Sequence, residues 1–189
     1  MRRISLVVFL IVGSQFAFSQ VEHLPLTVSY YAPFGTHLGV RIGTTFVTKS
    51  WEIEQDEFKI KKEILANTQV GFFSRPSISQ NYLLNGEVGL RRSSTKRKVY
   101  WAVLGSLSYL NTVETIGGSL NLGTGEFSKT TEMNSSIIPQ LNLEIGSNKQ
   151  KKATFFYRIF YGKKIPFTGE VSGFFGLEIG ARILFARKK

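Results

Sequence analysis

Residues 140–146 read QLNLEIG, and residues 176–185 read GLEIGARILF. In the first stretch, Leu141, Leu143 and Ile145 occupy every second position, and polar residues or glycine fill the positions between them. Successive side chains of a β-strand point to opposite faces, so this period of two predicts a strand with one apolar and one polar face. The second stretch repeats the pattern, and the two together indicate a sheet protein.

The same alternation recurs along the chain, whereas no long stretch follows the 3.6-residue period of a helix. Further strands are predicted at 24–32, 37–47, 64–73, 81–91, 99–110 and 153–162. Short turns are predicted at 33–36, 93–98 and 147–152, and longer loops at 50–62, 112–136 and 163–173. This rhythm predicts an all-β fold, a single antiparallel up-and-down barrel of about eight strands.

The N-terminus has the three parts of a secretory signal. A short basic start at 1–3 precedes an apolar run at 4–12, and the small residues Ala17 and Ser19 offer a small-x-small cleavage site. The apolar run is too short for a membrane-spanning helix, which needs roughly 20 residues. We therefore predict a cleavable signal peptide over 1–19 and one barrel domain over 20–189; the alternative is a buried N-terminal helix or strand.

Alternation by itself does not say which face of a barrel points inward. Three features favour a transmembrane barrel, which has its apolar face outside. The polar faces consist of Gly, Asn, Gln, Glu and Arg, while Lys is largely confined to the turns, and the last predicted strand ends in an aromatic residue. Aromatic residues also lie near the ends of the apolar faces, as in interfacial girdles: Tyr30, Phe46, Tyr82, Tyr109, Tyr161 and Phe185.

Over residues 24–186 the chain resembles a known family. The resemblance lies in the strand motifs at 70–73, 84–91, 104–110, 139–143 and 177–182. In their order and alternation they are similar to the small outer-membrane β-barrel proteins of Bacteroidota. The resemblance implies the barrel fold and a location in the cell outer membrane, and it supplies no catalytic residues.

If the polar faces point inward, charged side chains collect in the lumen. They are Arg41, Glu87, Arg91, Glu144, Arg158, Glu178 and Arg182. A barrel of about eight strands is barely wide enough for side chains, so these charges must pair. We predict a structural network of salt bridges. The alternative is a pathway or anion site that uses the one arginine in excess.

The composition argues against several other functions. The chain has no cysteine and only two histidines, His23 and His37, so we predict no metal site, no cofactor and no enzyme activity. His37 follows a predicted turn and is expected at a rim. The net charge of +11 could indicate nucleic acid, but the basic residues form no helical stripe and the chain is predicted to be exported.

The sequence thus predicts a monomeric outer-membrane barrel with a structural or interaction role and charged side chains in its lumen. Its expected partners are membrane lipids, with lipopolysaccharide as a further candidate, and the outer-membrane assembly machinery. One alternative is a narrow porin-like channel for small solutes. A second is a soluble periplasmic, lipocalin-like barrel, in which the apolar face would line the interior.

Overall fold

The computed structural model describes residues 23–35, 37–55, 58–121, 126–148, 152–167 and 169–186. The predicted signal peptide, 1–19, lies outside these residues. The described residues form eight strands: β1 (His23–Pro33), β2 (Leu38–Gln55), β3 (Phe58–Arg75), β4 (Ser79–Ser94), β5 (Val99–Asn121), β6 (Glu126–Ser147), β7 (Ala153–Pro166) and β8 (Ser172–Ala186). Within this part of the chain, no helix is long and apolar enough to cross a membrane.

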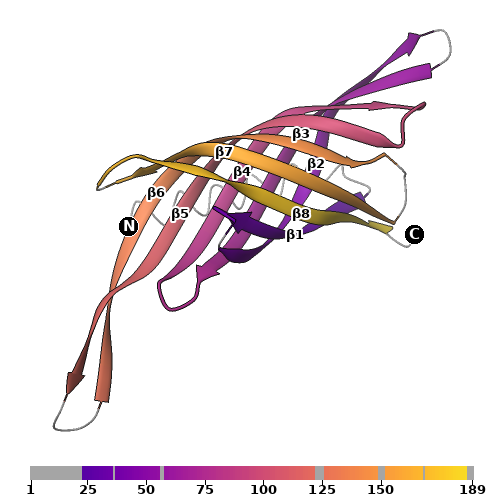
Figure 1. Ribbon diagram of the computed structural model, residues 1–189. Helices are drawn as coiled ribbons and strands as arrows, with labels where there is room; N and C mark the ends of the chain where they lie inside the picture. Colours follow the sequence, from indigo (N-terminus) through magenta and orange to yellow (C-terminus); the bar gives the residue numbers. More distant parts are fainter. Residues whose placement is uncertain are drawn as a thin grey trace, which may run out of the picture.

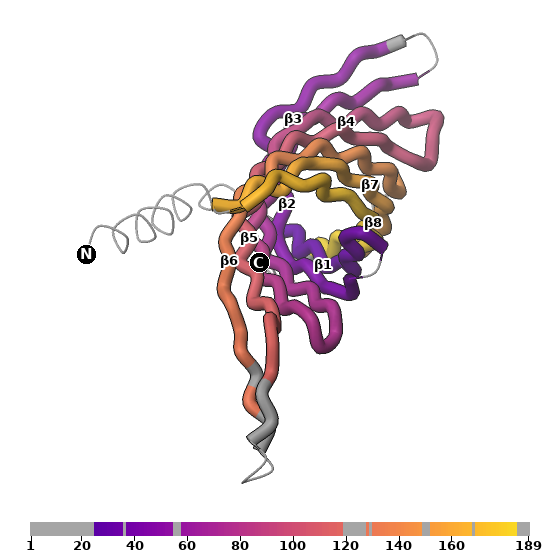
Figure 2. The backbone as a smooth tube through the Cα atoms, turned by 60° about the vertical axis from the view of Figure 1, so that its left-hand side comes forward, coloured from indigo at the N-terminus to yellow at the C-terminus, as the bar shows by residue number. Residues whose placement is uncertain are grey.

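Each strand pairs antiparallel with the next, and β1 pairs with β8, so the sheet closes on itself (Figures 1 and 2). The closing seam is long, running in register from His23↔Ala186 to Pro33↔Gly176. Closure leaves no unpaired edge in the body of the barrel. The predicted all-β, up-and-down fold is confirmed.

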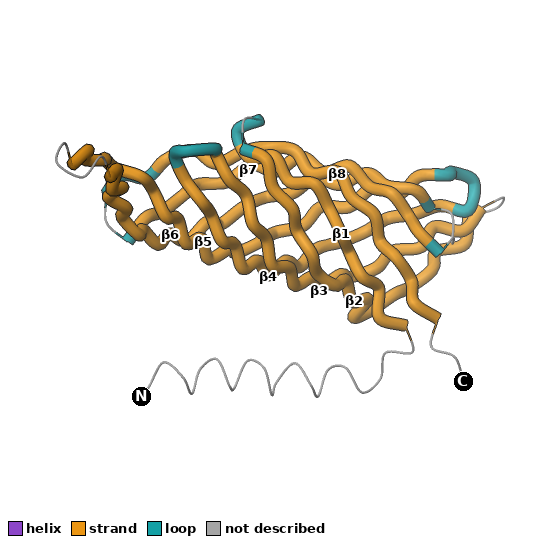
Figure 3. Tube along the Cα trace, turned by 90° about the horizontal axis from the view of Figure 1, so that it is seen from below, coloured by secondary structure: helices purple, strands orange, loops and turns teal. Residues whose placement is uncertain are grey.

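The turns gather at the two ends of the barrel, as Figure 3 shows. We call the end that carries His23 and Ala186 the terminal end; the turns after β2, β4 and β6 also lie there. The other end, with the turns after β1, β3, β5 and β7, is the distal end. The short turn predicted at 93–98 is confirmed, since β4 ends at Ser94 and β5 begins at Val99. The turns predicted at 33–36 and 147–152 include residues outside the described part of the chain.

The loops predicted at 50–62 and 112–136 are wrong, because both segments are largely strand. β2 continues to Gln55 and β3 begins at Phe58, while β5 continues to Asn121 and β6 begins at Glu126. These two hairpins project beyond the ring at opposite ends (Figure 1). In the β2–β3 hairpin, β2 beyond Thr44 pairs only with β3, whereas β3 still pairs with β4 as far as Ile60. In the outer part of the β5–β6 hairpin the two strands pair with each other, and the described side chains are exposed on both faces. A hairpin with two exposed faces needs no apolar face, so it lacks the period-two signal of a half-buried strand.

The described side chains also settle which face of each strand is inside. On β6, Asn142 and Glu144 are 0% and 1% exposed, whereas Leu141, Leu143 and Ile145 are each more than half exposed. The same alternation runs through β4 and β7. Apolar residues thus cover the wall and polar residues occupy the middle of the lumen, as predicted for a membrane barrel and opposite to a soluble ligand-binding barrel.

Candidate functional site: the barrel interior

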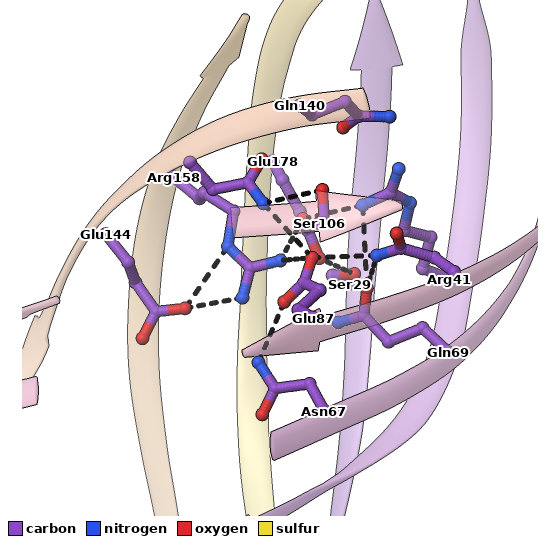
Figure 4. Close-up of polar contacts among 12 residues, drawn as sticks. Ser29, Arg41, Asn67, Gln69, Glu87, Ser106, Gln140, Glu144, Arg158 and Glu178 are labelled. Atoms are coloured by element: carbon purple, nitrogen blue, oxygen red, sulfur yellow. Dashed lines mark hydrogen bonds and ion pairs between the residues drawn. The ribbon is translucent and has the colours of Figure 1, made fainter. Parts of the chain in front are cut away.

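Arg158 on β7 is the centre of the interior charge network (Figure 4). It lies directly between Glu144 of β6 and Glu178 of β8 in the strand register. Its Nη2 lies 2.6 Å from Glu144 Oε2, and its Nη1 lies 2.9 Å from Glu178 Oε2 and 3.0 Å from Glu87 Oε1. All four side chains are fully buried. One guanidinium therefore joins carboxylates from three strands, and Glu87 reaches it from the opposite wall.

Glu144 is held by a second arginine on the terminal side. Arg182 Nη2 donates to both oxygens of Glu144, at 2.8 and 2.7 Å, and Arg182 Nη1 donates to the Tyr100 hydroxyl. That hydroxyl donates in turn to Glu144 Oε1 at 2.9 Å. Gly146 makes room for this arrangement, because a Cβ at its position would collide with the Tyr100 ring. Glu144 thus accepts from three side chains of three other strands.

Arg41 marks the distal boundary of the network. Its Nη1 lies 3.3 Å from Glu178 Oε2, while its guanidinium carbon lies 3.5 Å from the centre of the Tyr31 ring. The same ring stacks on Phe160 with centroids 4.8 Å apart. Ser29 Oγ donates to the other oxygen of Glu178 at 2.6 Å. The cation–π contact with Tyr31 joins the polar layer to an apolar one.

Amide side chains support the network from the β3–β4 wall. Asn67 Nδ2 donates to Glu87 Oε2 at 2.8 Å, and Asn85 Nδ2 donates to Glu87 Oε1 at 2.7 Å. Asn85 Oδ1 accepts from Ser108 Oγ at 2.7 Å. Each oxygen of Glu87 thus accepts one amide hydrogen bond in addition to the ion pair with Arg158. These bonds hold the carboxylate in the position that the ion pair needs.

Arg91 lies apart from the central network, nearer the terminal end. Its Nε lies 2.6 Å from Glu63 Oε2, and Lys61 Nζ lies 2.9 Å from Glu63 Oε1. Glu63 is not among the predicted lumen charges, because it borders a segment predicted as a loop. With Glu63 included, each of the four lumen arginines faces a carboxylate, and the predicted excess arginine is no longer a basis for an anion pathway.

Beyond Arg41, aromatic and aliphatic side chains fill the distal half of the lumen. We call this cluster the distal plug; its members are Tyr31, Phe73, Leu83, Leu110, Ile138, Phe160 and Phe174. Each is at most 3% exposed. Phe73 meets Tyr31 edge-on at 5.5 Å, and Phe174 lies 5.8 Å from Phe160. In the sequence, Tyr31 shares its face with Thr27 and Ser29, and Phe160 shares its face with Arg158, but their packing into one cluster was not predicted.

The terminal half of the lumen contains a cavity of about 250 Å³. Its lining includes Lys61, Glu63, Arg91, Tyr100 and Arg182, and its cations are those already paired with Glu63 and Glu144. Among the described residues, no cluster of three or more His, Cys, Asp or Glu side chains could hold a metal ion. The cavity therefore forms the terminal opening of the lumen, and its cations are already neutralised by carboxylates.

His37 lies at the distal rim, as expected for a residue that follows the first turn. Its ring packs 5.6 Å from Phe34 and 5.9 Å from Phe73. Burial and the nearby positive charge of Arg75 lower the pKa of His37. Its surroundings are those of an aromatic packing residue. The side chain of His23 lies outside the described set.

No protein-family model matches this chain, and no curated protein sequence matches it significantly. Solved structures do share its shape. The N-terminal β-barrel domain of Pseudomonas aeruginosa OprF superposes with a TM-score of 0.55 at 10% identity, over 87% of this chain and 98% of that domain. The outer membrane enzyme PagL superposes with a TM-score of 0.53 at 10% identity, over 84% of this chain and 98% of PagL. At these identities the likeness establishes the fold alone, which is that of the small outer-membrane β-barrels.

Proposed function

We propose that this protein is an integral outer-membrane β-barrel with a closed interior and a structural or interaction role. The observation that carries the proposal is the inversion of polarity between wall and lumen. The wall exposes apolar side chains on every strand, including Val40, Leu84, Leu107 and Ile159, each at least half exposed. So much apolar surface in water would aggregate, whereas lipid solvates it. A closed barrel also satisfies its backbone hydrogen bonds internally, as a membrane span requires.

The filled lumen argues for a structural role over the narrow channel. A conducting path needs continuous polar space, but the distal plug occupies one half of the lumen and paired charges occupy the middle. Buried ion pairs of this kind contribute little net stability against an apolar core, although removing one partner is costly. We take the network, from Arg41 to Arg182, as a polar core that fixes the register of strands far apart in the sequence.

The proposed role does not include catalysis. PagL is described as an outer membrane enzyme, and nothing of its activity is carried over here at 10% identity. The proposed partners are the lipids around the wall, lipopolysaccharide on the outer side, and the machinery that inserts such barrels. Three statements remain predictions: that the protein is a monomer, that residues 1–19 direct its export, and that it is related to the barrels of Bacteroidota.

Cell fractionation tests this proposal. The full chain is expressed in a Gram-negative host, and its outer membrane is separated from the inner membrane and the periplasm. We expect the protein in the outer-membrane fraction, with unheated samples migrating differently from boiled ones on a denaturing gel. A variant without residues 2–19 is the matched control and should stay in the cytoplasm. Release of the intact protein into the soluble periplasm would contradict the proposal.

A further inference from the structure

The described charges are distributed very unequally between the two ends. Ten Lys and Arg side chains and three Glu side chains lie at the terminal end: Lys49, Glu52, Glu54, Lys59, Lys61, Lys62, Glu63, Arg91, Arg92, Lys96, Arg97, Lys98 and Lys152. The distal end has three of each sign: Arg75, Glu114, Glu132, Lys163, Lys164 and Glu170. Nearly all the excess positive charge of the described barrel therefore lies at the terminal end.

Both tryptophans of the chain mark this same end. Across the strand register, Trp51 lies beside Lys62, Lys62 beside Arg92, and Arg92 beside Trp101. The bulge in β2 between Val47 and Lys49 shifts the alternation, which brings Trp51 onto this row. Tryptophan favours the boundary between lipid chains and head groups. The two cations between the tryptophans thus lie at head-group level.

A groove of about 760 Å³ lies on this part of the barrel. Val99, Trp101 and Ile145, about half exposed, give it an apolar part, and Arg92, Lys96 and Arg97 give it a cationic part. No Asp or Glu is among its lining residues, and within the described chain neither Arg92 nor Arg97 pairs with a carboxylate. Lys59 differs, since its Nζ lies 2.6 Å from Glu54 Oε1.

We infer that this groove binds an anionic phospholipid of the leaflet around the terminal end. The Arg92 and Arg97 guanidinium groups contact the phosphate, and Val99, Trp101 and Ile145 contact the first part of an acyl chain. Arginine suits this task because its planar fork pairs with phosphate oxygens in a bidentate manner. The inference rests on the proposed membrane location and adds to it a site and a lipid class.

Quenching of Trp101 fluorescence by brominated lipids tests this site. The reference protein carries Trp51→Phe, which leaves Trp101 as its one tryptophan. It is refolded into phosphatidylcholine vesicles that contain increasing fractions of brominated phosphatidylglycerol or, in parallel, brominated phosphatidylcholine. We expect the phosphatidylglycerol association constant to exceed that of phosphatidylcholine about thirtyfold, the size expected for two cations near an anionic surface. The preference should weaken as salt rises.

Two double variants then locate the preference. Arg92→Gln/Arg97→Gln should bring the two association constants close to equality while keeping the gel mobility of a folded barrel. Lys163→Gln/Lys164→Gln, at the distal end, is the matched control and should keep the full preference for phosphatidylglycerol. At constant ionic strength, replacing chloride by inorganic phosphate should leave the quenching unchanged, because the acyl contact is part of the site; displacement by phosphate under these conditions would overturn the lipid assignment.

Failure of this inference can be told apart from failure of the proposed function. Insertion into vesicles with equal association constants for the two lipids overturns the lipid site alone. Failure of the folded protein to insert into any vesicle overturns the membrane proposal and the lipid site with it. A preference that survives in the Arg92→Gln/Arg97→Gln variant places the lipid elsewhere and also overturns the assignment.

Discussion

At the scale of single residues, Glu144 shows how the lumen tolerates buried charge. Its carboxylate accepts hydrogen bonds from Arg158, Arg182 and Tyr100, so three donors together stabilise its negative charge. An isolated carboxylate in such a place would be expensive, because a buried ion without a partner loses its hydration. The arrangement also means that removing Glu144 leaves two arginines short of a partner.

Glu144→Leu should therefore destabilise the folded barrel strongly. Breaking a buried pair by removing one partner costs about 3–5 kcal/mol. Urea unfolding in lipid vesicles, followed by tryptophan fluorescence, measures the loss. Glu170→Leu, at an exposed distal position, is the control and should leave the unfolding free energy almost unchanged. Equal stability of the Glu144→Leu variant and the wild type would show that the network is dispensable.

His37 gives a prediction that depends on pH. Burial and the charge of Arg75 lower its pKa below the ordinary value of 6.5. Protonation then opposes folding, so the contribution of neutral His37 to stability is complete above pH 6.5 and is lost as the pH falls through the lowered pKa. NMR titration of His37 in micelles, with His23→Gln to simplify the spectrum, should give the low pKa.

The variant Arg75→Gln checks the second cause of that shift. Removing the nearby positive charge should raise the pKa of His37 part of the way toward its ordinary value, while burial keeps the remainder of the shift. Lys163→Gln, also distal, serves as a charge-matched comparison. An unchanged pKa in the Arg75→Gln variant would exclude the charge interaction.

At the scale of elements, the barrel is a ring with two arms. The distal arm, formed by the outer parts of β5 and β6, extends past the last β4 contact at Glu114 and the last β7 contact at Ser136. Beyond Thr115 and Ser135, whose backbones still hydrogen-bond to Ile78 and Phe167, each strand pairs only with the other. The arm therefore adds little to the ring, and its polar residues can serve contacts outside the barrel.

Shortening the distal arm should leave the ring intact. Replacing residues 116–130 by Asn-Gly would join the paired Thr115 and Thr131 through a two-residue turn. Heat-dependent gel mobility and the urea midpoint should match those of the wild type. A deeper excision of residues 109–137 removes Leu110 from the distal plug and should lower the midpoint. A comparable loss from the shorter excision would mean that the arm supports the ring.

At the scale of the whole molecule, an even number of strands in the described barrel brings both ends of the sheet to one side. Outer-membrane barrels keep their termini in the periplasm, so the basic terminal end should lie on the periplasmic side, at the inner leaflet of the outer membrane. The chain has no cysteine, which makes labelling of single cysteines direct. A membrane-impermeant maleimide should label Met133→Cys on intact cells and Thr95→Cys only after the outer membrane is opened. The reverse result would invert the orientation.

The closed lumen predicts the absence of conductance. Wild-type protein in planar bilayers should show no steady ion current, because the distal plug blocks the lumen even where the terminal opening is wet. The Glu144→Leu variant should stay closed as well, since it leaves Tyr31, Phe160 and Phe174 in place. A steady conductance of the wild type would favour the narrow channel.

The sequence by itself determined the strands of the ring, the two faces of each strand, and the positions of the short connections. Alternation is a local property, and residues 140–146 carry it whatever lies around them. That is why the inward position of Asn142 and Glu144 followed from sequence once a membrane barrel was chosen.

Only the tertiary structure decided which inward residues meet. Glu87 reaches Arg158 across the lumen, Glu63 pairs with Arg91, and Tyr31 stacks on Phe160 over 129 positions of sequence. Such contacts depend on strand register and on how the ring closes, which no local period encodes. The outer β5–β6 hairpin escaped prediction for a related reason. Its described side chains are exposed on both faces, so no alternation of apolar and polar residues marks it as strand.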